Sequence, residues 1–583
     1  MQQAIFDAIQ AALQELGIPE VDFVVERPSD LANGDYATNA ALVASKKLGK
    51  SPKEFAQEII EKLSPSTSLG IIEAIKIAGP GFINFYLSKE VITKEVAEAA
   101  TKADWANNNL YTGKKVMVEF TDPNPFKEFH IGHLMSNAIG EAISRTLEAA
   151  GANVIRVNYQ GDVGLHVAKA IWGYQQMGTE ENPILEGKWG MAYVLGAEKY
   201  ETDESAKAEI QERNKKIYER SDDEINKLYK EGREVSLQRF ENIYRILGTQ
   251  FTHFFFESQS WPVGVKLVHA HIKDGVFEMS DGAVVFKGEK VGLHTRVFLN
   301  SQGLPTYEAK DLGLLELKEE KENDLDLSIT ITANEQTEYF KVMLAAAKEL
   351  PEVQDIANKT QHISHGMMRF ADGKMSSRKG NFITGVSLLA DMQRGAHQKM
   401  QGRELKDANK TAEQVAVGAI KFTVLKQGSG KDIVFDPEKS LSLEGDSGPY
   451  LQYALTRARS LLRKAEAEGL RVSAEAAELL AKGEAWPSGL ERPESAALPL
   501  ERSSLERTLI HFPEVVARAA RELEPHYVTT FLTELASLFN SWYAAERVIG
   551  SADETYGLLL TKAFEQTMLK GLALLGIPAP EEM

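Results

Sequence analysis

The sequence predicts an α/β fold in which a parallel β-sheet is split by an insertion and followed by a purely helical region. Residues 115–160 read as a short apolar strand, a long helix closed by Gly151 and a second strand. Strand, helix and strand in about 50 residues are the βαβ unit of a parallel sheet. Residues 180–250 are charged and helical, and a further buried strand, LSITITAN, follows only at 327–334. From about residue 441 the pattern is wholly helical.

These patterns divide the chain into four predicted regions. An α+β N-terminal domain spans 1–108, where a Gly79-Pro80-Gly81 turn separates two strand-like runs. The sheet-containing domain spans 109–385 with a helical and strand insertion at about 175–300. A connecting stem spans 386–440, and an all-α domain spans 441–583, with a proline-containing surface loop near 483–499.

The composition favours a globular protein of a reducing compartment. Hydrophobic residues make up 43% of the 583 residues and charged residues 26%. The absence of cysteine excludes disulfides, thiol nucleophiles and cysteine-ligated zinc. No segment reaches the roughly 18 apolar residues of a membrane span, and the start of the chain reads as an amphipathic helix rather than a signal peptide. We therefore expect a cytoplasmic protein with no membrane partner.

The net charge argues against a nucleic-acid partner. The chain carries a formal charge of −18 and a sequence pI of about 5.3. Phosphate-binding domains are usually basic. A nucleic acid can therefore bind only if basic residues cluster on one face.

The first motif that indicates chemistry is His130-Ile131-Gly132-His133, between the first strand and the helix of the βαβ unit. Its two imidazoles lie at i and i+3, on the same side of a helix start. Free N–H groups and the positive dipole end suit a phosphate there, and Gly132 leaves room for a nucleotide. The alternative is a pair of ordinary surface histidines.

The second motif is Lys374-Met375-Ser376-Ser377-Arg378-Lys379-Gly380-Asn381. Its small, polar and glycine residues indicate a loop, while its cations and hydroxyls could bind a triphosphate. On its own, a solvated basic turn would be the better interpretation.

Together the motifs resemble the HIGH and KMSKS signatures of class I aminoacyl-tRNA synthetases, in which a Rossmann-like sheet carries one motif on each half. The resemblance implies that ATP binds with Mg²⁺, that an amino acid carboxylate attacks the α-phosphate, and that a tRNA ribose hydroxyl then takes the aminoacyl group. It implies catalytic roles for His130, His133 and Lys374. It also implies ATP contacts from His130, Gly132, His133, Lys374, Met375, Ser376, Ser377 and Arg378.

One departure from the general signature narrows the resemblance to arginyl-tRNA synthetases of the bacterial type. Ser377 replaces the second lysine of KMSKS. Arginyl-tRNA synthetases commonly show this change together with a lysine just upstream of HIGH. Lys127 stands three residues before His130, and the resemblance implies that it is the compensating catalytic lysine.

The same resemblance implies an arginine pocket. A guanidinium needs carboxylates in a fork geometry, and Tyr307 and Asp311 lie at i and i+4 on a predicted helix. Asp122, where the family often has serine, either alters the rim of the pocket or is merely solvated. No stretch resembles a large editing domain, and a charged substrate can be selected without one. The residues matching arginine-contacting positions are Glu119, Asn124, Tyr307, Asp311 and Gln336.

The outer regions resemble the tRNA-binding parts of the same family. Residues 33–39 and 79–84 resemble its additional N-terminal domain, and 448–454 its anticodon-binding domain. Tyrosine and arginine suit stacking on RNA bases and phosphate contacts, although a bundle core with a charged face is the plainer interpretation. The resemblance implies tRNA(Arg), L-arginine and ATP as partners of a monomer without a bound metal. The expected tRNA contacts are Asn33, Tyr36, Tyr450, Tyr453 and Arg457.

Two other functions fit part of the pattern. A nucleotidyltransferase also uses a His-x-Gly-His phosphate site, but it predicts a short single-domain chain without the 374–380 loop. A non-catalytic RNA-binding paralogue predicts damaged motifs, whereas His130, Gly132, His133 and Lys374 are all present.

Overall fold

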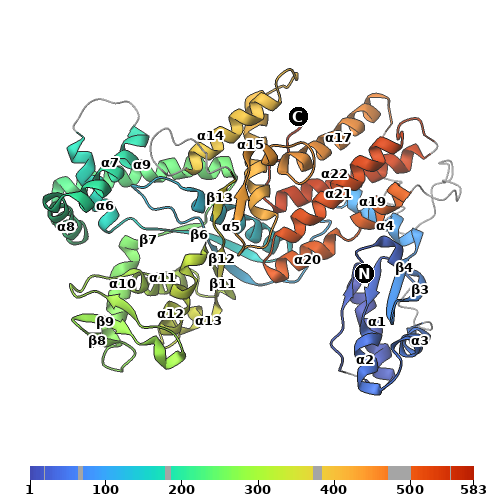
Figure 1. Ribbon diagram of the computed structural model, residues 1–583, viewed down its shortest axis with the longest axis horizontal. Coiled ribbons are helices and arrows are strands. Elements are labelled where there is room, and N and C mark those ends of the chain that lie inside the picture. Colours follow the sequence, from blue (N-terminus) through green and yellow to red (C-terminus); the bar gives the residue numbers. More distant parts are fainter. Residues whose placement is uncertain (19, 64–69, 178–184, 372–383, 471–499, 552) are drawn as a thin grey trace. The chain divides into compact units, whose positions relative to one another are not determined.

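The computed structural model describes residues 1–583 except 19, 64–69, 178–184, 372–383, 471–499 and 552 (Figure 1). The chain forms two compact units. Unit 1 contains residues 1–106, 454–515 and 531–570, and unit 2 contains 107–453, 516–530 and 571–583. The predicted loop near 483–499 lies outside the described residues.

Unit 1 combines a small sheet with helices. Its strands are antiparallel in the order β1-β2-β4-β3. The predicted hairpin is formed by β3 and β4, and its turn contains Gly79 and Gly81, which both have positive φ. The N-terminal elements are α1 (Gln2–Glu15), β1 (Val25–Glu26), β2 (Tyr36–Thr38), α2 (Ala40–Leu48), α3 (Pro52–Leu63), β3 (Ile72–Ala78), β4 (Phe82–Leu87) and α4 (Lys89–Thr101). The C-terminal helices of the chain contribute residues to both units. They are α17 (Gly448–Ala467), α19 (Leu500–Leu509), α20 (Phe512–Glu522), α21 (His526–Ala545) and α22 (Glu554–Leu574).

The centre of unit 2 is a five-stranded parallel sheet in the order β12-β11-β5-β6-β7. The predicted βαβ unit is confirmed, because α5 (Ile131–Ala149) connects two neighbouring strands. The chain starts at β5, moves outward on one side, and then crosses to β11 on the other side. Parallel sheets of this kind bind ligands where the strand order reverses, at the carboxyl ends of the strands. The strands are β5 (Lys115–Glu119), β6 (Asn153–Gln160), β7 (His253–Phe256), β11 (Leu327–Ala333) and β12 (Thr360–His365).

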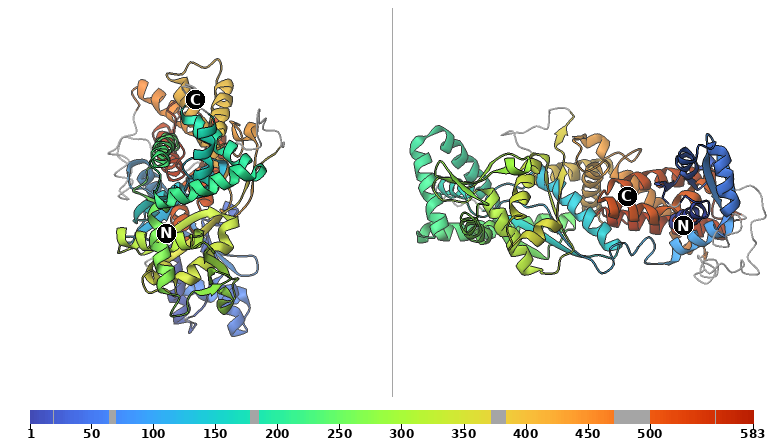
Figure 2. Two further views of the ribbon diagram at one scale, coloured as in Figure 1. Left: turned by 90° about the vertical axis from the view of Figure 1, so that its left-hand side faces the viewer. Right: turned by 90° about the horizontal axis from the view of Figure 1, so that it is seen from below.

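Two insertions interrupt this sheet. Helices α6–α9 connect β6 to β7 and gather at one side of unit 2 (Figures 1 and 2). A three-stranded antiparallel sheet with flanking helices connects β7 to β11. Edge strand β7 thus lies inside the stretch that the sequence predicts as one insertion. The inserted elements are α6 (Leu165–Gln176), α7 (Leu185–Thr202), α8 (Glu204–Glu219), α9 (Asp223–Leu247), α10 (Glu257–Ala270), β8 (Glu278–Ser280), β9 (Ala283–Phe286), β10 (Arg296–Leu299) and α11 (Tyr307–Lys321).

The remaining elements of unit 2 pack beside the sheet. The segment after β12 begins with strand β13, which pairs in parallel with β14, and its helices α14 and α15 form an apolar core with the start of α5 and the end of α9. Two helices connect β11 to β12, namely α12 (Thr337–Ala347) and α13 (Gln354–Lys359). The elements after β12 are β13 (Met368–Phe370), α14 (Gly385–Lys399), α15 (Ala408–Leu425), β14 (Ile433–Phe435) and α16 (Pro437–Ser440).

Candidate active site

The two predicted histidines stand at the start of α5, directly after central strand β5. Helix α5 begins at Ile131 with His130 as its N-cap residue, so the amides of Ile131 and Gly132 precede the first intrahelical hydrogen bond. Such amides and the positive end of the helix dipole favour an anion. The start of α5 lies beside the switch point between β5 and β11, where a ligand crevice is expected.

The imidazoles of His130 and His133 are stacked on each other. Their ring centroids are 3.5 Å apart and their planes are inclined by 21°. The backbone N–H of His130 donates to His133 Nδ1 over 3.1 Å, which leaves the proton on Nε2 as a donor. A Cβ on Gly132 would lie 3.0 Å from His130 Cε1, so glycine allows the first imidazole to lie over the helix start.

Both histidines are held neutral. Desolvation and the neighbouring cation of Lys127 lower the pKa of His130, and burial with the same cation lowers the pKa of His133 well below its usual value. A neutral imidazole retains one N–H donor. The pair can therefore donate hydrogen bonds to an oxyanion without contributing a permanent positive charge.

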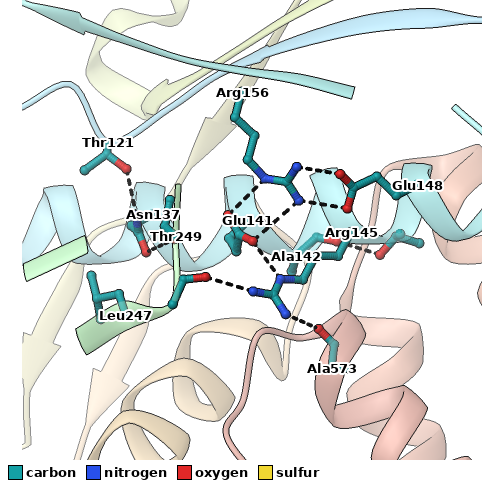
Figure 3. Close-up of polar contacts among 12 residues, drawn as sticks. Thr121, Asn137, Glu141, Ala142, Arg145, Glu148, Arg156, Leu247, Thr249 and Ala573 are labelled. Carbon is teal, nitrogen blue, oxygen red and sulfur yellow. Dashed lines mark hydrogen bonds and ion pairs between the residues drawn. The ribbon is translucent and has the colours of Figure 1, made fainter. Parts of the chain in front are cut away.

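Buried polar contacts fix α5 to the ends of both central strands. Ser136 Oγ accepts from Thr121 N over 3.0 Å and donates to Ile331 O over 3.0 Å. Asn137 Nδ2 donates to Thr121 Oγ1 over 3.0 Å, and Thr249 Oγ1 donates to Asn137 Oδ1 over 3.3 Å (Figure 3). The start of α5 is therefore positioned by the carboxyl ends of β5 and β11.

The loop between β5 and α5 is held in an unusual backbone conformation. Thr121, Asp122 and Phe126 have φ values of 81°, 45° and 69°, a region that residues other than glycine rarely adopt. Asp122 Oδ1 accepts from Tyr159 N over 2.7 Å, so this acid fastens the loop to β6 and is not merely solvated. Asn124 Oδ1 accepts from Gly161 N over 3.0 Å.

Lys127 lies near the histidine pair, as predicted. Its ammonium lowers the pKa of both imidazoles and sits 5.2 Å from the ring centroid of Tyr193. Burial and the neighbouring Lys169 lower the pKa of Lys127 itself, against the opposing effect of Glu257. The structure therefore brings together three of the four predicted catalytic residues.

The predicted arginine contacts Glu119 and Asp311 belong to a buried acidic cluster. Asp311 accepts from Tyr339 Oη over 2.5 Å, and Glu119 Oε2 lies 2.8 Å from Lys318 Nζ. Burial, together with the neighbouring carboxylates of Glu119 and Glu257, raises the pKa of Asp311 to about 8. Burial and Glu119 raise the pKa of Asp122 well above its usual value. The buried carboxyl groups of Glu119, Asp122 and Asp311 thus have fewer cations beside them than negative charges to neutralise, and a guanidinium would supply a further cation.

The other predicted arginine contacts lie around this cluster. Tyr307 begins α11 one helical turn before Asp311 and is 65% exposed. Asn124 is half-buried in the loop after β5, and Gln336 is exposed directly after β11. Side chains from β5, its following loop, α11 and the end of β11 thus surround one end of the sheet.

A cavity of about 470 Å³ adjoins this cluster. Three lysines and three tyrosines are among the residues that line it, namely Lys127, Lys169, Lys310, Tyr193, Tyr218 and Tyr307. Lys310 Nζ donates to Glu257 Oε2 over 2.6 Å. Positive charge beside aromatic rings suits a nucleotide.

Four residues that contact the predicted arginine-binding residues or their neighbours were not predicted from the sequence, namely Lys310, Lys318, Glu257 and Tyr339. Two of them were accessible to reasoning, because Lys318 follows Asp311 by seven residues and Lys310 follows Tyr307 by three on the same helix. Glu257 and Tyr339 reach the site only through tertiary folding.

The second motif cannot be placed. Lys374, Met375, Ser376, Ser377 and Arg378 all lie outside the described residues. Among the residues that the structure does describe, no group of three or more His, Cys, Asp or Glu side chains could hold a metal ion.

The expected tRNA contacts have different environments. Asn33 is exposed, and Tyr450 and Tyr453 are half-buried. Arg457 donates to Asn540 Oδ1 over 2.9 Å and lies 4.5 Å from the centroid of the Tyr543 ring.

Tyr36 departs from the expectation, because its side chain is fully buried within unit 1. Its hydroxyl donates to Glu514 Oε1 over 2.6 Å, and its ring packs on the edge of His511. In this structure the side chain has no surface to offer to RNA and instead joins β2 to the helices of the unit.

No helix among the described residues is long and apolar enough to cross a membrane.

Comparison with known proteins gives a consistent result over the whole chain. Residues 95–437 match the family described as tRNA synthetases class I (R), catalytic domain. Residues 3–87 match the arginyl tRNA synthetase N terminal domain, and 451–583 match the DALR anticodon binding domain.

Individual relatives agree with the family matches. The arginine–tRNA ligase of Limosilactobacillus reuteri is 31% identical over 596 residues and covers all of both chains. That of Treponema pallidum is 29% identical and covers 99% of this chain and 98% of its own. The solved arginyl-tRNA synthetase of Thermus thermophilus superposes with a TM-score of 0.79 at 25% identity, covering both chains fully. The three-part match excludes the single-domain nucleotidyltransferase alternative, and the chain belongs to the class I arginyl-tRNA synthetase family.

Proposed function

We propose that the residues between the histidine pair and the acidic cluster catalyse the arginine–tRNA ligase reaction of this family. In that reaction, arginine and ATP give arginyl-adenylate and diphosphate, and the arginyl group then passes to the 3′-terminal ribose of tRNA(Arg) with release of AMP. The observation that carries the proposal is the placement of buried carboxylates for a guanidinium next to neutral imidazole donors at a helix start.

The first step requires the arginine carboxylate to reach the α-phosphate. Asp311 and Glu119 would hold the guanidinium, and Asn124, Tyr307 and Gln336 would complete the pocket. A carboxylate oxygen then forms a bond to the α-phosphorus while the bond to the bridging oxygen of diphosphate breaks. His130 and His133 would donate to the phosphate oxygens on which negative charge increases. Lys127 lies beside these histidines and is suited to neutralising the leaving diphosphate together with Lys374 and its neighbours.

Magnesium enters this proposal as part of the Mg·ATP substrate. The described residues offer no group of three or more candidate metal ligands. No residue is therefore assigned to the metal, and the protein's own contribution is to bind and orient the phosphates.

The second step requires the 3′ end of tRNA beside the adenylate. The cavity lined by Lys127, Lys169 and Lys310 with Tyr193 and Tyr218 adjoins the acidic cluster, and its charge and rings suit a terminal nucleotide. A ribose hydroxyl then attacks the arginyl carbonyl carbon, and AMP leaves with the electrons of the mixed-anhydride bond. The lysines of this cavity would offer the RNA end a local positive charge in a chain whose net charge is −18.

The proposal keeps the predicted division of labour along the chain. Residues 1–108 would bind tRNA, 109–385 would catalyse, 386–440 would connect, and 441–583 would bind the anticodon. Exposed Asn33 and half-buried Tyr450, Tyr453 and Arg457 remain candidates for RNA contacts. We also expect a monomer that acts in the cytoplasm.

The experiment measures arginine-dependent exchange of labelled diphosphate into ATP, with tRNA present, for His130→Ala, His133→Ala and Lys374→Ala. Each loss of a donor or cation should slow exchange by about 10²-fold or more. Near-normal exchange by folded His130→Ala and His133→Ala would refute the phosphate role. Absence of exchange by the wild-type protein would favour the non-catalytic RNA-binding paralogue.

A further inference from the structure

A second cluster of charges surrounds the far half of α5, well away from the histidines. We call Glu141, Arg145, Arg156, Glu148 and Lys421 the Glu141 cluster. Arg145 Nε donates to Glu141 Oε1 over 2.6 Å, and Arg156 Nε donates to Glu141 Oε2 over 3.2 Å (Figure 3). Arg156 also makes two hydrogen bonds to the carboxylate of Glu148, of 2.6 and 2.9 Å. Glu141 and Lys421 are buried.

The cations of this cluster cap the carboxyl ends of two helices. Lys421 Nζ donates to Leu247 O over 2.7 Å, at the last residue of α9. Arg145 Nη2 donates to Gly248 O over 2.8 Å, and Arg145 Nη1 donates to Ala573 O in the last turn of α22 over 3.0 Å (Figure 3). Terminal helix carbonyls lack intrahelical donors, and cations there also meet the negative end of the dipole.

The C-terminal segment of the chain lies directly on this cluster. A Cβ on Gly576 would lie 2.7 Å from Lys421 Nζ and 3.5 Å from Glu141 Cγ. Gly576 also has a φ of 62°, which favours glycine. Beyond it, Pro578 O accepts from Gln452 Nε2 over 2.7 Å, and Met583 packs against the apolar core around α14 and α15. The backbone of Gly576 thus closes over two buried charged side chains.

A buried lysine in this setting is costly for the fold. Burial and, to a smaller extent, Arg145 lower the pKa of Lys421 to about 7, against the opposing effect of Glu141. Burial acts against the ionised form of Glu141 as well, but the cations of Arg156, Arg145 and Lys421 lower its pKa overall. Apolar replacement of a whole buried ion pair is often neutral or stabilising, whereas removal of one partner is usually destabilising. The desolvation cost of Lys421 is offset by its attraction to Glu141 and its hydrogen bond to Leu247 O, and these interactions tie α15 to α5 and α9.

The position of the cluster on α5 suggests a different role. Glu141 follows Ile131 by ten residues on one continuous helix, which is about 15 Å along the axis at 1.5 Å per residue. A helix transmits a shift at one end to the other. On the basis of the proposed function, we propose that Glu141, Arg145 and Lys421 are positioning residues for adenylate formation, which fix α5 and its histidines relative to α9 and the C-terminal segment.

The proposal predicts a loss of rate without a loss of binding. Lys421→Met keeps the length and apolar stem of the side chain but removes its charge. Its kcat for diphosphate exchange should fall by roughly tenfold, because small misplacement of catalytic groups has large effects on rate. The KM for arginine should stay within about twofold, because the acidic cluster on β5 and α11 does not depend on Lys421. Lys426→Met is the matched control, since Lys426 is an exposed lysine on the C-terminal side of the same helix, paired with Asp446.

The pH dependence of Lys421→Met distinguishes an effect on the position of α5 from an effect on the stability of the fold. The folded-state pKa of Lys421 lies below its ordinary 10.5, so the folded protein gains stability as pH rises from about 7 to about 10. Lys421→Met should lose this gain and leave Leu247 O without its donor, so its stability deficit relative to wild type should be largest at high pH. The attraction of Lys421 for Glu141 requires the ammonium, so the rate difference from wild type should be largest below pH 7 and shrink above pH 8.

Gly576→Ala provides a second test that leaves all charges in place. Its new Cβ should push the C-terminal segment away from Lys421, and kcat should fall while KM for arginine is unchanged. Folded variants with wild-type kcat at pH 6.5, or with kcat and KM changed together, would overturn the positioning role. If Lys421→Met does not fold, Gly576→Ala decides the question alone. Wild-type charging with arginine is measured in parallel, so that failure of the proposed function is recognised separately.

Discussion

At the scale of single residues, the proposed binding of arginine by Asp311 predicts a dependence of arginine affinity on pH. With a pKa of about 8, Asp311 holds a proton at neutral pH. A guanidinium beside it would favour the carboxylate, so arginine binding at the proposed site should release this proton. Arginine affinity should therefore rise as pH increases from about 6.5 to about 8 and then level off.

This prediction is checked by measuring the KM for arginine in aminoacylation across that range at saturating ATP and tRNA. Asp311→Asn should raise KM by about tenfold or more and remove the pH dependence, while KM for ATP stays nearly constant. Asp355→Asn, at an exposed position on α13, is the control. Equal changes in the KM for arginine and for ATP would mean that the arginine pocket lies elsewhere.

Lys127 gives a second prediction at this scale. Its partly buried ammonium sits beside His130 and His133, so Lys127→Met should slow diphosphate exchange by about 10²-fold. The change should act on kcat far more than on the KM for arginine. Lys399→Met, at an exposed position of α14, should have no effect. Unchanged kinetics of the Lys127 variant would remove its compensating role for Ser377.

At the scale of elements, the contact between α5 and β5 decides whether the site forms. A Cβ on Gly140 would overlap the ring of Phe120 directly after β5. Gly140→Ala should therefore destabilise the protein by about 1–3 kcal/mol through overpacking. Gly187→Ala is the matched control, because Gly187 is also helical and has open space around it; it should be neutral or slightly stabilising. Denaturant unfolding compares the two, and equal stability would show that α5 can move away from the strand.

The elements also show what the sequence could predict. Local patterns in the sequence predict the βαβ unit, the β3–β4 hairpin and the helices of the insertion. The structure confirms these elements. Strand β7 has only four residues, HFFF, whose apolar run has no period. It joins the sheet by pairing with β6, which is a tertiary event. Likewise Glu257 meets Lys310 across 53 residues of chain, and no local pattern indicates that pair.

For the motif residues, the sequence predicted which side chains lie close together better than it predicted whether a side chain is buried or exposed. His130, His133 and Lys127 lie together as expected, because their spacing on one loop and helix start fixes their proximity. Tyr36 is different, since a tyrosine in a turn motif can face RNA or the interior, and here burial against Glu514 and His511 decides the matter.

At the scale of the whole molecule, the matches to three consecutive family regions cover nearly the full chain. The acidic net charge, which argues against RNA on composition alone, is a sum over the whole chain, whereas the cavity beside the proposed active site is lined by three lysines. Under the proposed function, substrate specificity is set by the buried carboxylates for arginine and by separate regions of the chain for tRNA.

The most direct test of this claim is aminoacylation of total tRNA with each of the twenty amino acids in turn, in the presence of ATP and magnesium. Charging with arginine alone is the predicted result. Charging with another amino acid would keep the class I reaction but contradict the assignment of the pocket. Absence of charging by a folded protein that binds ATP would contradict the ligase function itself.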